Sequence, residues 1–190
     1  VYMDAVGDDL GATVGNIINC SYKLLSQVKP DAMLVLGDTN SCLSVIPAKR
    51  LHIPIFHMEA GNRCFDECLP EETNRRIVDI ISDVNMCYSE HARRYLNASG
   101  VAKERTYVTG SPMAEVLHQN LAEIEASDVH ARLGLEKGKY ILLSAHREEN
   151  IDTEKNFKSL FPAIIAMAEK YDMPILYTCH PDSYTPLTLP

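Results

Sequence analysis

Three ionisable side chains follow short apolar runs that are typical of buried strands, and each could take part in proton transfer. They are Asp38 after residues 32–36, Glu59 after residues 53–56 and His146 after residues 140–144. Ligands collect at the carboxyl ends of parallel strands, so a cleft between two sheets could bring the two carboxylates to face His146 and Arg147. This arrangement suits an anionic substrate whose reaction involves proton transfer.

The densest group of charges lies between residues 59 and 76. It includes Glu59, Asp66, Glu71, Glu72, Arg75 and Arg76. Leu69-Pro70 followed by two glutamates predicts a helix start, because proline fits the first helical position and acidic residues suit the positive end of the helix dipole. The glutamates also admit a purely structural interpretation, in which they pair with Arg75 and Arg76 at four-residue spacing for about 0.2–0.5 kcal/mol each. Glu59 has no helical register to explain it.

Structural interpretations remain open for other candidates. Asp38 could cap the helix that follows it, and His146 could be a hydrogen-bonded core histidine. Cys64 and Cys68 are the closest pair of the six cysteines, but a zinc site would normally need a second matching pair.

The elements that must position these residues alternate between strand and helix. Apolar residues at helical spacing predict a helix over residues 9–28. The other expected elements are strands at 32–36, 53–56, 84–88, 106–108, 140–144 and 173–178, with helices from 41, from 70, over 89–96 and over 153–170. This alternation predicts mostly parallel, doubly wound α/β sheets in two domains, residues 1–110 and 111–190, with a connecting segment over 122–139.

Composition narrows the class of protein. The 190 residues are 46% hydrophobic, which allows a sizeable core, and the formal net charge is -8. That acidity argues against nucleic acid as a partner, since phosphate backbones leave a basic footprint. No apolar run is long enough for a membrane span, and no signal-peptide pattern is present. With no paired cysteine motif, we expect reduced thiols and a cytoplasmic protein.

Four motifs together resemble the non-hydrolysing UDP-N-acetylglucosamine 2-epimerase family, and they occur in that family's order. They are Gly37-Asp38-Thr39, His57-Met58-Glu59-Ala60-Gly61-Asn62-Arg63, Pro70-Glu71-Glu72-Thr73-Asn74-Arg75 and Ala145-His146-Arg147-Glu148-Glu149-Asn150. The resemblance implies two Rossmann-like domains arranged as in glycosyltransferase-B enzymes, with the active site between them. It implies a UDP-sugar substrate, no metal or other cofactor, and a homodimer when the protein is complete.

The resemblance also implies a mechanism and roles for single residues. The C2 proton would be removed with elimination of UDP, and UDP would then add back with protonation from the opposite face, which requires two proton-transfer groups. By motif match, the acid–base set is Asp38, Glu59 and Glu71, and His146 steadies the departing diphosphate. The expected substrate contacts are Arg63, Arg75, Arg147 and His180.

The exact substrate and reaction stay open at this level. The local sequence of residues 62–67 and 146–152 is more similar to a capsule-pathway branch of this family. Enzymes of that branch act on UDP-2-acetamido-2,6-dideoxy-hexoses and make UDP-N-acetyl-L-fucosamine. A glycosyltransferase of the same architecture and a non-catalytic UDP-sugar-binding domain are the alternatives. A metal-dependent hydrolase built from His57, Glu59, Asp66 and His146 is a further one, although no helix carries paired ligand spacing.

Two departures from the family pattern predict an incomplete protein. The chain starts inside the family's first unit, and residues 182–190 do not continue its second domain. We therefore expect a fragment that carries most acid–base residues but has an incomplete nucleotide site and low activity on its own.

Overall fold

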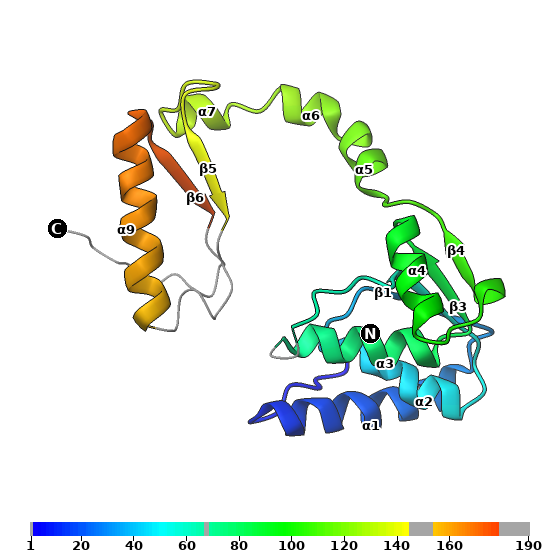
Figure 1. Ribbon diagram of the computed structural model, residues 1–190. Helices are drawn as coiled ribbons and strands as arrows, with labels where there is room; N and C mark the ends of the chain where they lie inside the picture. The colour runs from blue at the N-terminus through cyan, green and yellow to red at the C-terminus, as the bar shows by residue number, and fades with distance from the viewer. Residues whose placement is uncertain (1, 67–68, 145–153, 179–190) are drawn as a thin grey trace. The chain divides into compact units, whose positions relative to one another are not determined.

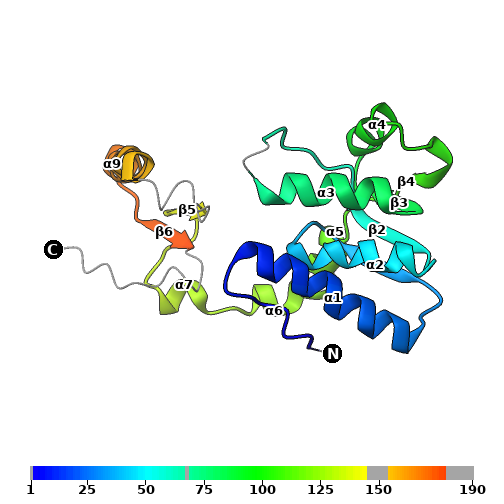
Figure 2. The same ribbon diagram turned by 90° about the horizontal axis from the view of Figure 1, so that it is seen from below.

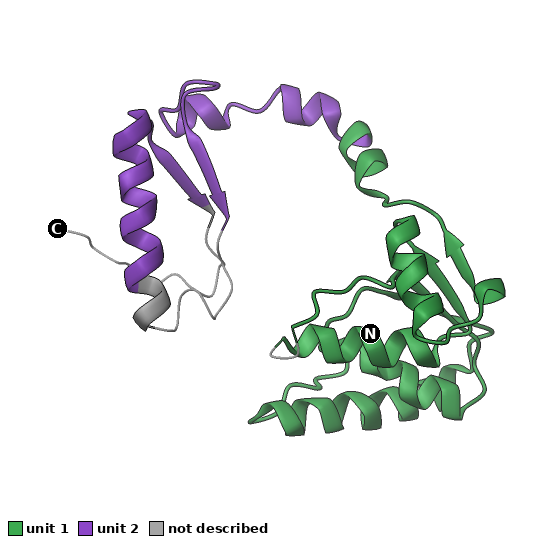
Figure 3. Ribbon diagram, in the orientation of Figure 1, with its two compact units in different colours: residues 1–118 green, residues 119–190 purple. Residues whose placement is uncertain are grey.

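The computed structural model describes residues 2–66, 69–144 and 154–178. The chain forms two compact units, residues 1–118 and 119–190 (Figure 3). The boundary between the units falls inside α5 (Met113–Gln119). The assignment of domains at residues 1–110 and 111–190 stays a prediction.

The first unit alternates strands and helices along the chain (Figure 1). Before α5 its elements are α1 (Leu10–Val28), β1 (Met33–Leu36), the 3-10 helix η1 (Asn40–Ser44), α2 (Val45–Arg50), β2 (Ile55–Ala60), α3 (Pro70–Ile81), β3 (Val84–Cys87), α4 (Glu90–Ala98), the 3-10 helix η2 (Lys103–Arg105) and β4 (Thr106–Val108). All neighbouring strands pair in parallel, in the order β1-β2-β3-β4. Because such crossovers are right-handed, α2, α3 and α4 all lie on one face of this sheet (Figures 1 and 2).

Helix α1 has clear start and stop signals. The Asp9 carboxylate accepts a 2.7 Å hydrogen bond from the Ala12 N–H, which caps the first turn. Lys29 then takes a left-handed conformation and Pro30 follows, so the helix ends. In the part of the chain that the structure describes, neither this helix nor any other is long and apolar enough to cross a membrane.

The core of the first unit lies between the sheet and its helices. Its main cluster joins α1, β1, α2, β2 and α3, and consists of Ile17, Val35, Cys42, Leu43, Val45, Ala48, Ile53, Ile55 and Val78. A smaller cluster of Ala60, Cys87, Ala92 and Leu96 packs α4 against the ends of β2 and β3. Both clusters lie on the helix-covered face, so the packing fixes the carboxyl ends of β1, β2 and β3.

The opposite face of this sheet is apolar as well. Leu34, Leu36 and Tyr107 on it are 65%, 61% and 54% exposed. In the strand register Leu36 lies beside Met58, and Met58 beside Met86. Parallel sheets usually bury both faces. The face opposite α2, α3 and α4 thus carries apolar residues that these three helices do not cover.

The second unit contains a smaller parallel sheet. Its elements are α6 (Leu121–Glu125), α7 (Val129–Arg132), β5 (Ile141–Ser144), α9 (Glu154–Tyr171) and β6 (Ile175–Thr178). Strands β5 and β6 pair in parallel, with Ile141 opposite Ile175. The α/β fold class expected from the sequence is therefore confirmed in both units.

The predicted limits of one strand were wrong. The apolar run at residues 53–56 was expected to be the whole strand, but β2 extends from Ile55 to Ala60 and contains both His57 and Glu59. His57 is only 1% exposed and Glu59 lies at a shift in register between β2 and β3. The strand continues through these polar residues because His57 contacts Gly37 and Asp79, and Glu59 accepts a hydrogen bond from Asn62.

The cysteines of the first unit differ sharply in their surroundings. Burial is the main cause that raises the pKa of Cys42 to about 12 and that of Cys87 to about 11, whereas Cys64 is exposed. Because the thiolate is the reactive form, an alkylating agent at about pH 8 should modify Cys64 in the folded protein and spare the two buried thiols. Peptide mass mapping before and after denaturation checks this, and labelling of Cys42 in the folded protein would contradict it.

Candidate active site

Glu59 occupies an unusual backbone conformation near the carboxyl end of β2. Its φ is 67°, in the left-handed region, at the bulge between Met58 and Ala60. Such a conformation costs a residue other than glycine about 1–3 kcal/mol and is typical of functional sites. One carboxylate oxygen, Oε1, accepts a 3.2 Å hydrogen bond from Asn62 Nδ2. The other, Oε2, faces Gly37, where an added Cβ would lie 3.4 Å from it.

Asp38 follows β1 and is held by a residue of α3. Arg75 donates from Nε and Nη2 to the same carboxylate oxygen, Oδ2, at 2.8 and 2.5 Å. The helix after Asp38 begins without a side-chain cap, so Asp38 binds the arginine instead of capping it. Among the described residues, Oδ1 of Asp38 receives no hydrogen bond.

The two adjacent glutamates at the start of α3 have opposite surroundings. Glu72 is 1% exposed and accepts from the Cys64 N–H, the Cys64 thiol, Arg75 Nη1 and Arg76 Nε, at 3.2, 3.3, 3.3 and 3.0 Å. The expected pairing of Glu72 with Arg76 is thereby confirmed. The expected pairing of Glu71 with Arg75 was wrong, because Arg75 binds Asp38 and Glu72 instead. Glu71 is half-buried and has no hydrogen bond or ion pair within the described part of the chain. Glu72 therefore holds the structure together, while Glu71 is available for chemistry.

Two contacts bring these carboxylates to one end of the sheet. Glu59 faces Gly37, the residue before Asp38, and Asp38 binds Arg75. Glu71 lies one helical turn before Arg75 and so shares its face of α3. Each of Asp38, Glu59 and Glu71 keeps at least one oxygen without a donor among the described residues. A group of partly free carboxylates can accept and return protons.

The carboxylate of Glu72 should contribute to stability only above acidic pH. Burial alone would raise its pKa, but the Cys64 N–H, the Cys64 thiol and Arg76 outweigh burial and lower it below 4.5. A carboxylate with a lower pKa in the folded state stabilises at higher pH, and this contribution is lost as pH falls through the folded pKa. From about pH 5 to about pH 3, the Tm of wild type should fall more steeply than that of Glu72→Gln, followed by circular dichroism. Parallel curves would contradict the role given to Glu72.

Asp79 of α3 was missed by sequence reasoning, although it lies directly behind this site. It is fully buried, and its carboxylate accepts from the Gly61 N–H at 3.1 Å and from Arg63 Nη1 at 2.6 Å. His57 Nδ1 lies 3.0 Å from Asp79 Oδ1 without an aligned hydrogen bond. The available signal was one acidic residue within the apolar run Ile77-Val78-Asp79-Ile80-Ile81.

Tyr88 is a second residue that sequence reasoning did not single out. It follows β3 directly, and Asp38 comes two residues after β1, so both residues lie at the same edge of the sheet. Burial, with a smaller contribution from the charge of Glu59, raises the pKa of Tyr88 above its ordinary value of 10. The phenol therefore stays protonated near neutral pH and can donate a hydrogen bond beside Glu59.

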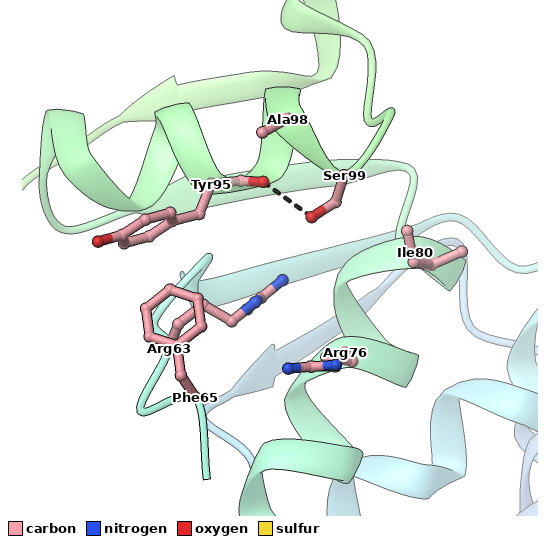
Figure 4. Close-up of a pocket in the computed structure, with 7 residues that line it drawn as sticks. All are labelled: Arg63, Phe65, Arg76, Ile80, Tyr95, Ala98 and Ser99. Atoms are coloured by element: carbon pink, nitrogen blue, oxygen red, sulfur yellow. Dashed lines mark hydrogen bonds between the residues drawn. The ribbon is translucent and has the colours of Figure 1, made fainter. Parts of the chain in front are cut away.

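A hollow of about 350 Å³ lies between α3 and α4. Figure 4 shows the residues that line it: Arg63, Phe65, Arg76, Ile80, Tyr95, Ala98 and Ser99. The Phe65 and Tyr95 rings meet edge to face, with centroids 5.3 Å apart. The ring contact holds the turn after β2 against α4, which helps to keep Arg63 in place.

Three predicted site residues, His146, Arg147 and His180, lie outside the described residues. Of the predicted first-unit residues, the structure brings together Asp38, Glu59 and Arg75, with Glu71 on the same helix face as Arg75. Arg63 is turned toward Asp79, and its role as a substrate contact stays a prediction. In residues 2–66, 69–144 and 154–178, no three His, Cys, Asp or Glu side chains are grouped so that they could hold a metal ion.

Comparison with known proteins identifies relatives of this chain. The profile of the family described as "UDP-N-acetylglucosamine 2-epimerase" matches residues 1–188. A curated UDP-N-acetylglucosamine 2-epimerase from Methanocaldococcus jannaschii is 34% identical over 175 residues, which are 90% of this chain and 48% of that protein. A UDP-2,3-diacetamido-2,3-dideoxy-D-glucuronate 2-epimerase from Pseudomonas aeruginosa is 32% identical over 85% of this chain and 46% of its own length.

Solved structures give the same result. A structure of UDP-N-acetylglucosamine 2-epimerase from Rickettsia bellii is 45% identical with a TM-score of 0.88, over 95% of this chain and 47% of that one. The M. jannaschii enzyme in complex with UDP-GlcNAc and UDP is 32% identical with a TM-score of 0.85, over 94% and 50%. The chain thus spans about half the length of these relatives. By its profile match, its identity to these proteins and its fold, the chain belongs to the UDP-N-acetylglucosamine 2-epimerase family.

Proposed function

We propose that the whole protein carrying this sequence is a non-hydrolysing UDP-N-acetylglucosamine 2-epimerase, an isomerase that interconverts UDP-GlcNAc and UDP-ManNAc. The observation that carries the proposal is the group formed by Asp38, Glu59 and Glu71 at one end of the first sheet. Each keeps an oxygen without a donor among the described residues, whereas Glu72 beside them has its oxygens occupied. Family membership supports the choice of a UDP-sugar as substrate.

The proposed reaction needs two proton-transfer groups and a departing diphosphate. One carboxylate of the group takes the proton from C2 of the sugar, while the bond from C1 to the UDP oxygen breaks and a C1–C2 double bond forms. UDP then adds back to C1, and a second acid delivers a proton to the opposite face of C2. Proton transfer by positioned side chains contributes about 10²–10⁴-fold to such reactions.

The remaining site residues complete the proposal. Arg75 orients Asp38 by donating from Nε and Nη2 to Oδ2. This leaves Oδ1, which has no donor among the described residues, open to the sugar. His146 would steady the diphosphate as it leaves, and Arg147 and His180 would contact the substrate. These three assignments come from the family motifs alone.

A related sugar is the alternative substrate. One relative is named as a UDP-2,3-diacetamido-2,3-dideoxy-D-glucuronate 2-epimerase. Proteins similar in sequence to this chain are therefore named for more than one UDP-sugar substrate. The motif of residues 62–67 favours UDP-2-acetamido-2,6-dideoxy-L-talose, with UDP-N-acetyl-L-fucosamine for capsule as product. We further propose a cytoplasmic homodimer for the whole protein, which gel filtration with light scattering and cell fractionation would test.

The experiment is proton NMR of UDP-GlcNAc incubated with the whole protein and, in parallel, with residues 1–190. We expect signals of the manno epimer with the whole protein, and much slower formation with residues 1–190. Formation of UDP-L-FucNAc from the 6-deoxy substrate alone would move the assignment to the capsule-type reaction. No epimer from either sugar would contradict the proposed function, and transfer to an acceptor would indicate a glycosyltransferase.

A further inference from the structure

Asp79 is placed to control the conformation of Glu59 from both sides. Its buried carboxylate lies 3.0 Å from the ring of His57, two residues before Glu59. It also accepts from the N–H of Gly61, two residues after Glu59, and from the side chain of Arg63, four residues after it. One side chain of α3 therefore contacts the strand before the bulge and hydrogen-bonds the turn after it.

The backbone at Glu59 needs such support. At φ 67° the residue is in a conformation that the surrounding structure must enforce, because an unrestrained glutamate would relax from it. The Gly61 N–H and the Arg63 guanidinium bind different oxygens of Asp79, Oδ1 and Oδ2. The carboxylate thus sets both the distance and the direction of the turn that follows Glu59.

The same cluster reaches the end of β1. His57 Nε2 lies 3.2 Å from the Gly37 carbonyl oxygen, and a carbonyl can only accept, so Nε2 is the donor. Gly37 precedes Asp38 and faces Glu59 Oε2. The chain of contacts from Asp79 through His57 to Gly37 therefore joins the two strand ends that carry Asp38 and Glu59.

We propose that Asp79 is a positioning residue for the C2 proton transfer, which acts by holding the bulge at Glu59 through its hydrogen bonds to Gly61 and Arg63, with its carboxylate packed against the His57 ring. It touches no substrate and donates no proton to the sugar. The inference rests on the proposed function, since the rate of C2 proton exchange is its catalytic readout. A displacement of about 1 Å at a catalytic group can cost about 100-fold in rate, so loosening the bulge should lower kcat.

Asp83, just before β3, offers a matched control because it binds the other end of the same strand. Its carboxylate also holds a backbone N–H of β2 and a cation, since it accepts from the Ile55 N–H at 3.0 Å and from Lys49 Nζ at 2.5 Å. However, its bond to Ile55 lies at the amino end of β2, away from Asp38, Glu59 and Glu71. Asp83→Asn removes a similar set of bonds without touching the bulge.

The experiment compares Asp79→Asn and Asp83→Asn in the whole protein, at a temperature where circular dichroism shows both to be folded. We expect Asp79→Asn to lower kcat for C2 exchange about 10- to 100-fold with KM within about twofold, and Asp83→Asn to change neither by more than about threefold. Amide hydrogen exchange by mass spectrometry should show faster exchange in peptides covering residues 57–63 for Asp79→Asn only.

Two results would overturn the inference. One is unchanged amide protection of residues 57–63 in Asp79→Asn, and the other is a kcat lowered equally in both variants. If Asp79→Asn does not fold, Asp79→Glu, which keeps the charge but displaces it by one methylene group, carries the same test. If the wild type shows no C2 exchange, the proposed function fails, and amide protection alone then decides whether Asp79 holds the bulge.

Discussion

Glu71→Gln in the whole protein is expected to lower C2 proton exchange by about 10²–10⁴-fold and to leave the Tm nearly unchanged. The substitution keeps the shape of the side chain and removes its ability to carry a proton as a carboxylate. Because Glu71 has no hydrogen bond or ion pair within the described part of the chain, the fold loses little. Exchange is measured by proton NMR in deuterium oxide, and stability by thermal unfolding.

The neighbouring Glu72→Gln is the matched comparison. It is the same chemical change one residue along α3, but it removes a buried charge that accepts from the Cys64 N–H and from both Arg75 and Arg76. Hydrogen bonds to buried charged groups are worth about 1.5–3 kcal/mol each, so its Tm should fall clearly. A Glu71→Gln protein that exchanges within about threefold of wild type would remove Glu71 from the acid–base set.

Gly61→Ala is expected to destabilise the first unit by about 3–5 kcal/mol, the sum of backbone strain and overpacking. Gly61 has φ 79°, and an added Cβ would lie 2.4 Å from the Ala92 carbonyl oxygen and 3.0 Å from Leu96 Cγ. Both partners belong to α4, one of them backbone, so the methyl group can be accepted only if α4 moves away from β2. Urea unfolding at equilibrium measures the loss.

Gly100→Ala separates the two causes. Gly100 also has a left-handed backbone, with φ 89°, but no atom lies within 4 Å of the Cβ position. It should therefore cost only the conformational strain, about 1–2 kcal/mol. Equal losses of unfolding free energy in the two variants would show that the close approach of β2 and α4 at Gly61 is relaxed easily.

Local signals in the sequence were enough to locate most elements. Helix α3 begins at Pro70 as expected, because proline at the first helical position and two glutamates after it act within one turn. Helix α1 likewise begins after Asp9 and ends before Pro30. The strand ends were placed less well, because β2 continues through the polar residues His57 and Glu59. The contacts of His57 come from Gly37 after β1 and Asp79 of α3, which give no signal in the neighbouring sequence.

The roles of charged residues depended most on distant contacts. The sequence could not decide whether Asp38 caps a helix or serves the site, because its partner Arg75 is far along the chain. Residue type and spacing treated Glu71 and Glu72 alike, and the family motif alone singled out Glu71. The fold shows that Glu72 is the one buried with four donors. Asp79 read as one polar position of a helix, and its burial against the turn after β2 follows only from the packing of α3 on the sheet.

Deuterium incorporation at C2 tests the central claim most directly. It reports breakage of the C2–H bond, which is the step proposed for the carboxylates of Asp38, Glu59 and Glu71. The whole protein is incubated with UDP-GlcNAc in deuterium oxide, and both UDP-sugars are examined by NMR and mass spectrometry. The account predicts one deuterium at C2 of the epimer and, with time, of the remaining substrate. An epimer that keeps the original C2 proton would contradict it, because inversion would then proceed without proton transfer to Asp38, Glu59 or Glu71.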